Sequence, residues 1–154
     1  KNIEDAINDG LRIKRLSPFA IEVLDENLLN LAKNDEVYYA IKDYFSFGEN
    51  PDDSLGALNL IEFNSPIKNL PKGVKSSKLI IRSYETDKKD LIKSFWDIRK
   101  KGVGLLAAME GSARPVAFVE DPVVPPENLP EFIADLKKLF DGYGLKYGLY
   151  GHVD

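Results

Sequence analysis

The spacing of apolar residues along the chain predicts amphipathic helices at three places. Apolar side chains fall on one helical face over residues 3–14, from about 88 to 101, and over 129–140. This period of 3.6 residues is typical of helices that pack one face against a core. Asp25 is a suitable N-cap for a shorter helix, whose apolar side chains are Leu28, Leu29 and Ala32.

Glycines and capping residues indicate where two of these helices begin and end. Gly102 follows Lys101 and predicts that the second helix stops there, because glycine is a poor helix former. Asn128 and Glu131 have the spacing of a capping box at the start of the last helix.

Short stretches of β-branched and apolar residues predict the strands. They are residues 57–64, 78–84, 116–120 and 147–153. Residues 19–24 are also apolar and β-branched, and the pattern leaves two alternatives open for them, a strand or an extension of the flanking helices.

The order of these elements predicts an α+β fold. The second half of the chain alternates strand, helix, strand, helix, strand. Short, partly alternating strands suit an antiparallel sheet. We therefore expect a ferredoxin-like antiparallel sheet with helices packed on one face, in a single domain that spans residues 1–154. A small doubly wound sheet is the alternative.

Composition narrows the chemistry that this chain can perform alone. It has no cysteine, which excludes disulfides, cysteine nucleophiles and thiolate ligation of a metal or iron–sulfur cluster by these residues. The net charge of −4 provides no basic field, so we expect no nucleic-acid partner. No apolar run approaches the roughly 20 residues of a membrane helix, so we expect no integral membrane segment.

The ends of the sequence suggest a piece of a larger protein. The first residue is Lys1, the sole methionine is Met109, and the chain stops just after its only histidine, His152. We expect the isolated chain to be colourless and inactive.

His152 and Arg99 are the first candidates for chemistry. His152 follows Gly151 at a predicted strand end, where an imidazole could act as metal ligand, general base or hydrogen-bond donor. The alternative is a surface histidine near the terminus. Arg99 lies near a predicted helix C-terminus and could grip a carboxylate with two hydrogen bonds. Its alternative is a solvated cation that complements the helix dipole.

Several acids raise a similar question. Glu120 and Asp121 are adjacent, so in an extended chain one of them could face the core and need a partner. A buried acid held by backbone N–H groups is one interpretation, and a substrate-orienting or acid–base role is the other. Glu62 shares a strand face with apolar residues, and Arg82 is a plausible ion-pair partner for it.

Four segments together resemble the C-terminal, cap-type domain of FAD-linked oxidases, a family that includes glycolate oxidase D subunits, D-lactate dehydrogenases and D-2-hydroxyglutarate dehydrogenases. They are residues 114–130 (RPVAFVEDPVVPPENLP), 147–154 (YGLYGHVD), 95–104 (FWDIRKKGVG) and 20–25 (AIEVLD). The resemblance is strongest from residue 95 onward. It is greatest to large bacterial members that join a FAD domain, this domain and an iron–sulfur region in one polypeptide.

The resemblance implies an FAD-dependent 2-hydroxy-acid dehydrogenase, with FAD bound mainly by an N-terminal domain outside this chain. Arg99 matches the family arginine that binds the substrate carboxylate. His152 matches the first histidine of a Gly-His-x6-His pattern, which lies next to the flavin and binds a divalent metal in some members. Such a metal would polarise the substrate hydroxyl. The second histidine of that pattern would fall beyond Asp154, so the metal site is incomplete here.

One departure from the family bears on the substrate. Val119 stands where some hydroxyglutarate-type members carry a lysine, which leaves that specificity open among D-lactate, glycolate and D-2-hydroxyglutarate. Arg114, at a nearby position, could supply the missing positive charge to the substrate. A cytoplasmic location is expected, with contact to the inner membrane through an electron acceptor as the alternative. A competing hypothesis is a non-catalytic, ferredoxin-like ligand-binding or regulatory module.

Overall fold

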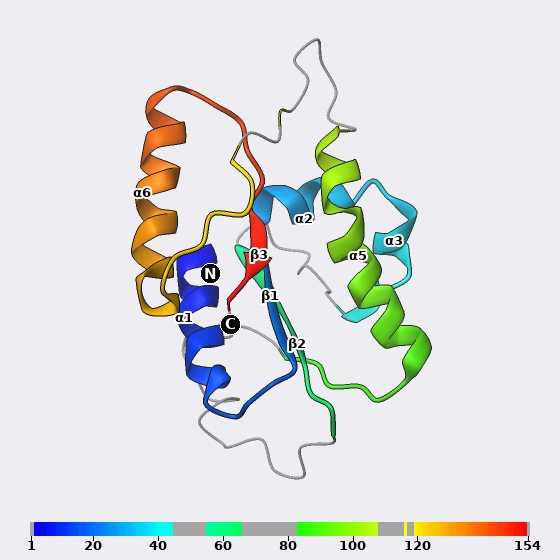
Figure 1. The fold of residues 1–154 in the computed structure, drawn as a ribbon. Coiled ribbons are helices and arrows are strands. Elements are labelled where there is room, and N and C mark those ends of the chain that lie inside the picture. Colours follow the sequence, from blue (N-terminus) through cyan, green and yellow to red (C-terminus); the bar gives the residue numbers. More distant parts are fainter. Residues whose placement is uncertain (1, 45–54, 66–82, 108–115, 117–118, 154) are drawn as a thin grey trace.

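A three-stranded antiparallel sheet forms the centre of the structure, a computed structural model (Figure 1). The residues that the structure describes are 2–44, 55–65, 83–107, 116 and 119–153. The strands are β1 (Ala20–Asp25), β2 (Ala57–Glu62) and β3 (Tyr150–His152). Their order is β2-β1-β3, so the first strand of the chain is central and pairs antiparallel with both neighbours.

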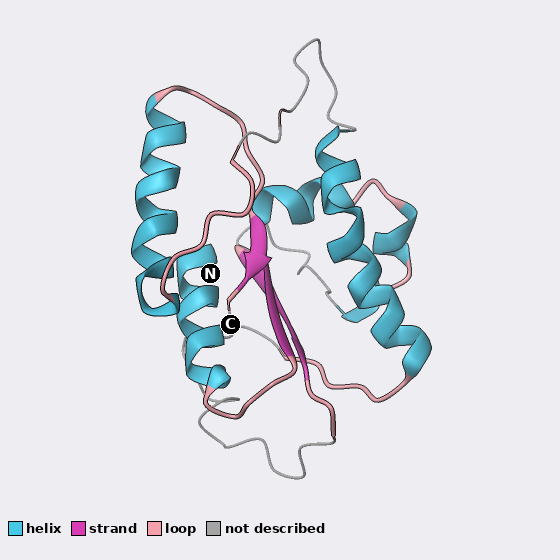
Figure 2. Cartoon of the chain, in the orientation of Figure 1, coloured by secondary structure: helices cyan, strands magenta, loops and turns pink. Residues whose placement is uncertain are grey.

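Helices occupy most of the remaining described chain (Figure 2). They are α1 (Ile3–Lys14), α2 (Glu26–Ala32), α3 (Glu36–Tyr39), α5 (Lys89–Ala107) and α6 (Leu129–Gly142), with short 3-10 turns η1 (Lys42–Tyr44) and η3 (Pro126–Asn128). Within the described part of the chain, no helix is both long and apolar enough to cross a membrane.

The sheet is covered by helices on both faces (Figure 1). Ile21 and Val23 of β1 pack with Ile3 and Ile7 of α1, and side chains of α6 border this cluster. On the other face, Leu24 belongs to a second cluster, which α2 and α5 complete with Leu28, Leu29, Ala32, Ile98 and Leu105. The expected α+β class and antiparallel sheet are confirmed. The helices lie on two faces rather than one, and the central strand is therefore buried on both sides.

Strand β1 resolves the ambiguity of residues 19–24, and β2 confirms the strand predicted over 57–64. The predicted closing strand is shorter, since β3 comprises only Tyr150–His152. The prediction over residues 78–84 falls almost wholly outside the described residues. Of the strand predicted over 116–120, the described positions do not lie in a strand.

Helix α5 is longer than the sequence predicts, and it is closely packed at Gly102. Gly102 does not end it, and the helix continues to Ala107. A Cβ atom on Gly102 would lie 3.4 Å from Leu28 Cδ2 and 3.4 Å from Tyr150 Cε1, so this position of α5 has room for little more than a methyl group. The predicted capping box of α6 is also wrong, because the Asn128 side chain makes no capping hydrogen bond.

Candidate functional site

The buried carboxylate of Glu22 joins the two residues that the sequence analysis singled out. Its Oε2 lies 2.7 Å from Nε of Arg99, and its Oε1 lies 2.9 Å from Nδ1 of His152. The three residues come from β1, α5 and β3 and are far apart in the sequence. The structure therefore brings both catalytic candidates, Arg99 and His152, to one place.

Strand pairing and helix packing position these side chains. In the antiparallel register, Glu22 is opposite His152 and Leu24 is opposite Tyr150. Alternate residues of a strand point to the same face. Glu22 therefore shares its face with Leu24, which packs in the cluster that contains Ile98 of α5. Because Ile98 is fully buried there, its neighbour Arg99 is held beside that face.

The buried position of Glu22 makes its ion pairs necessary for the stability of the site. The Glu22 side chain is only 5% exposed and the Arg99 side chain 22% exposed, whereas the His152 side chain is 68% exposed. A buried carboxylate is costly unless charged or hydrogen-bonding groups surround it. Arg99 and His152 provide these partners. Because the imidazole is exposed, the side of the site that is open to solvent lies at the end of β3.

Arg99 is held from a second direction by an aromatic ring. Its guanidinium carbon lies 4.4 Å from the ring centroid of Tyr150, the distance of a cation–π interaction. Among the described residues, the hydrogen bond of its side chain is made through Nε. Its two terminal nitrogens are therefore available for a carboxylate from outside the chain, in the paired geometry that guanidinium favours.

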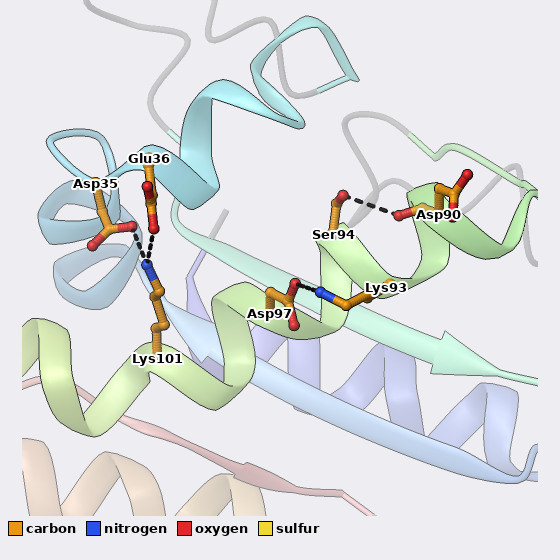
Figure 3. A network of polar contacts seen from close by, with 7 residues as sticks. All are labelled: Asp35, Glu36, Asp90, Lys93, Ser94, Asp97 and Lys101. Carbon is orange, nitrogen blue, oxygen red and sulfur yellow. Dashed lines mark hydrogen bonds and ion pairs between the residues drawn. The ribbon is translucent and has the colours of Figure 1, made fainter.

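Ion pairs along α5 attach this helix to its surroundings (Figure 3). Lys101 lies 3.0 Å from Oδ1 of Asp35 and 3.0 Å from Oε1 of Glu36, both at the N-terminus of α3. The pKa of Asp35 is lowered by the backbone N–H of Val37 and by Lys101. These exposed contacts contribute little stability each, but they join α3 to the helix that carries Arg99.

The other sequence candidates do not join this site. Glu120 and Asp121 are exposed, so the interpretation of one of them as a buried acid is wrong. Arg114 lies outside the described residues, as does Arg82, the partner proposed for Glu62.

Glu22 is a site residue that the sequence analysis does not name, although a signal for it is present. It is the one acid inside the apolar run AIEVL, and such a residue on a buried strand requires a partner. The same argument led to Glu62 and Glu120.

This site offers one ligand atom for a metal ion. Nε2 of His152 is available, with the Glu22 carboxylate behind the ring, which is how metal-bound histidines are commonly oriented. No group of three His, Asp or Glu side chains that could hold a metal occurs in the part of the chain that the structure describes. These residues do not by themselves fit a metal ion.

Comparison with known proteins identifies the family. The family model described as FAD linked oxidases, C-terminal domain, matches residues 1–154. The chain belongs to this family of FAD-linked oxidase C-terminal domains. The family resemblance expected from the sequence is thereby confirmed.

Curated relatives of this FAD-linked oxidase domain carry the name D-2-hydroxyglutarate dehydrogenase. The chain is 36% identical to the protein of Pseudomonas putida over 97% of its length. It is 32% identical to that of Escherichia coli over 99% of its length, and 31% identical to that of Haemophilus influenzae over its whole length. The chain spans only 16% of the length of each of these relatives. No solved structure matches the chain.

Proposed function

We propose that this domain supplies the substrate-binding and proton-accepting groups of an FAD-dependent dehydrogenase that oxidises a 2-hydroxy acid. The observation that carries the proposal is the placement of Arg99 and His152 on the two oxygens of Glu22. A 2-hydroxy acid has a carboxylate and a hydroxyl on adjacent carbons, which suits a guanidinium beside an imidazole. The family and the names of the curated relatives support the same class of substrate.

In this proposal, each residue has a defined task. The terminal nitrogens of Arg99 bind the substrate carboxylate, because an always-charged planar cation recognises it with two parallel hydrogen bonds. Nε2 of His152 accepts the proton of the substrate hydroxyl as general base. Glu22 and Tyr150 keep the guanidinium in place from two sides.

FAD, when bound, supplies the acceptor for the hydride that leaves the hydroxyl-bearing carbon, so the products are a 2-oxo acid and reduced flavin. The residues of this chain suit a domain that contacts the substrate and faces FAD, while another domain binds the FAD. His152 is anchored at Nδ1 while most of its ring is exposed, so Nε2 can face a substrate held against another domain. We therefore propose that FAD is bound mainly by a separate, N-terminal domain, which is this domain's partner.

Further features of the larger protein remain part of the proposal. Arg114 would bind a second anionic group of the substrate, which would favour a dicarboxylic acid such as D-2-hydroxyglutarate over D-lactate or glycolate. An iron–sulfur cluster would belong to another part of the protein, since this chain has no cysteine. A cytoplasmic location, with electrons passed to an acceptor at the inner membrane, fits these parts.

The proposal is tested by mixing the full-length protein, loaded with FAD, with D-lactate, glycolate or D-2-hydroxyglutarate in the absence of oxygen. We expect at least one of them to bleach the flavin absorbance in a single turnover. The His152→Ala variant should bleach at least a hundredfold more slowly, because general-base catalysis contributes about 10²–10⁴-fold. Flavin that stays oxidised with all three acids would contradict the proposal.

A further inference from the structure

We propose that Gly10 of α1 is a positioning residue of the site, which acts on His152 through Val153 from the opposite face of the sheet. This role deepens the proposed function and rests on it for the task of His152. The contacts among α1, β1 and the end of β3 that carry it are the same whichever substrate is oxidised.

His152 lies on a strand that has few contacts of its own to hold it. β3 comprises only Tyr150–His152 and is at an edge of the described sheet, where it pairs with β1. Gly151, the residue before His152, contributes no side chain, and the His152 side chain is largely exposed. The position of this histidine therefore depends on how firmly the residue after it is packed.

Val153 is the firmly packed residue at this end of the chain. Its side chain is 1% exposed and packs between α1 and the sheet, in the cluster that contains Ile7 and Ile21. Its backbone N–H donates to the carbonyl oxygen of Ile21 at 3.0 Å. Val153 is thus held to the central strand by its backbone and to α1 by its side chain.

Val153 and His152 face opposite sides of the sheet, because successive residues of an extended chain alternate between its faces. Val153 packs on the face that α1 covers. Nδ1 of His152 lies 2.9 Å from Oε1 of Glu22, on the face that α5 covers (Figure 1). A displacement of Val153 is passed to His152 through the peptide bond that joins them.

Gly10 leaves Val153 no room to move toward α1. A Cβ atom on this buried glycine would lie 3.0 Å from Cγ1 of Val153 and 3.2 Å from Cγ2 of Ile21. Carbon atoms in favourable contact are about 3.5–4.0 Å apart. An alanine here would therefore force a neighbour to shift by a few tenths of an ångström.

Val153 is the neighbour that would yield. Ile21 is fully buried in the central strand, whereas Val153 follows the edge strand. Helix α1 itself is fixed by other contacts. Nδ2 of Asn59 in β2 donates to the carbonyl oxygen of Ala6 at 2.7 Å, and a lysine of α6 forms an ion pair with the first turn of α1. The shift is therefore directed to Val153 and so to His152.

Gly10→Ala in the full-length protein, loaded with FAD, tests this role. With a 2-hydroxy acid that reduces the flavin, the limiting rate of reduction without oxygen should fall roughly fivefold or more, since a reacting group misplaced by about 1 Å can cost about a hundredfold. The acid concentration that gives half the limiting rate should change by less than about twofold, because Arg99 on α5 keeps its place. Lower stability alone would reduce the amount of folded protein without this split.

A control and a compensating change sharpen the test. Gly142→Ala, at a helical glycine where a Cβ atom would meet no described atom within 4 Å, should leave both quantities unchanged. Val153→Ala alone should slow flavin reduction because it removes the anchor. Added to Gly10→Ala, it removes Cγ1, the atom on which the new Cβ presses, so the double variant should be faster than Gly10→Ala.

Hydrogen exchange of the Val153 amide reports the same displacement without any substrate. The Asp25 amide is the internal reference, since it donates to the carbonyl oxygen of Leu149 at 2.9 Å at the other end of this strand pair. Measured by mass spectrometry that resolves single amides in the full-length protein, exchange at Val153 relative to Asp25 should be faster in Gly10→Ala and unchanged in Gly142→Ala.

Three results would overturn the proposal. They are an unchanged limiting rate in folded Gly10→Ala, unchanged exchange at Val153 in that variant, and rate losses that multiply fully in the double variant. If Gly10→Ala does not fold, Val153→Ala must show the same split between rate and half-saturating concentration. If no acid reduces the flavin of the unmodified protein, the proposed function fails, and the exchange measurement still decides whether Gly10 holds Val153 in place.

Discussion

A Cβ atom on Gly102 would lie 3.4 Å from the ring of Tyr150, the same ring that underlies the guanidinium of Arg99. The closeness of α5 to β3 at this point brings Arg99 within reach of Glu22 and His152. A glycine inside a helix costs about 1 kcal/mol relative to alanine. A Cβ atom here would make ordinary contacts, and a larger side chain would have no room.

Substitution of this glycine by a branched side chain should therefore destabilise the fold. In Gly102→Val, the added methyl groups would press on Tyr150 and Leu28, and overpacking of this kind costs about 1–3 kcal/mol. Gly104 is the matched control, since a Cβ atom there would meet no other atom within 4 Å and the residue is exposed in the same helix. Gly104→Ala should stabilise the chain by about 0.5–1 kcal/mol. Urea unfolding measures both, and two changes of the same sign would contradict the packing described.

The buried face of α5 should be the more sensitive one. Ile98 is 1% exposed and belongs to the cluster on the Glu22 side of the sheet. Ile98→Ala should lower the free energy of unfolding by about 2–5 kcal/mol, because it removes buried methyl groups and leaves a cavity. Leu139→Ala on α6 should change it little, since Leu139 is 54% exposed. Equal losses in the two variants would show that α5 does not pack as described.

Asp25 should make stability depend on pH. Burial raises its pKa from 3.8 to about 6, against the lowering effect of the Leu28 N–H that it caps. Between about pH 4 and 6, the folded chain keeps a proton that the unfolded chain has released. The stability from this group is thus fully present below pH 4 and is lost as the pH rises through 6. The loss is about 3 kcal/mol for a shift of this size.

Asp25→Asn tests this dependence, because asparagine keeps the capping oxygen and removes the titration. Relative to the unmodified chain, the variant should gain stability between pH 4 and pH 8, as followed by urea unfolding at both values. Glu26→Gln, at the exposed neighbouring position, should show no such relative gain. A constant difference between Asp25→Asn and the unmodified chain at both pH values would contradict the raised pKa.

Local sequence patterns predicted the elements well where one residue type decides the outcome. The apolar period placed α1 and α6, and Asp25 does accept from the N–H of Leu28 as an N-cap. Gly102 misled because a glycine lowers helix propensity without excluding it from a helix interior, and α5 continues past it to Ala107. The packing of distant segments against each other cannot be predicted from the sequence of one segment.

The candidate site was also only partly predictable from the sequence. Residue chemistry and family resemblance singled out Arg99 and His152, but nothing in either segment predicts that they share one carboxylate. That contact requires the register of β1 with β3, which places His152 opposite Glu22. It also requires the packing of α5, which brings Arg99 to Glu22 across 77 positions of the sequence. Periodicity also did not show that helices cover both faces of the sheet, because that depends on β1 being central.

The most direct test of the proposed function is the role of Arg99 as the carboxylate-binding cation. In the full-length protein, Arg99→Ala should lower kcat/KM for a 2-hydroxy acid by a factor that corresponds to roughly 2–4 kcal/mol, the loss expected when a partly buried charge partner is removed. Lys100→Ala, which removes an exposed cation from the next position, should leave kcat/KM within about twofold. If Arg99→Ala retains the kcat/KM of the unmodified protein, the site does not bind substrate as proposed, and a non-catalytic binding module becomes the better account.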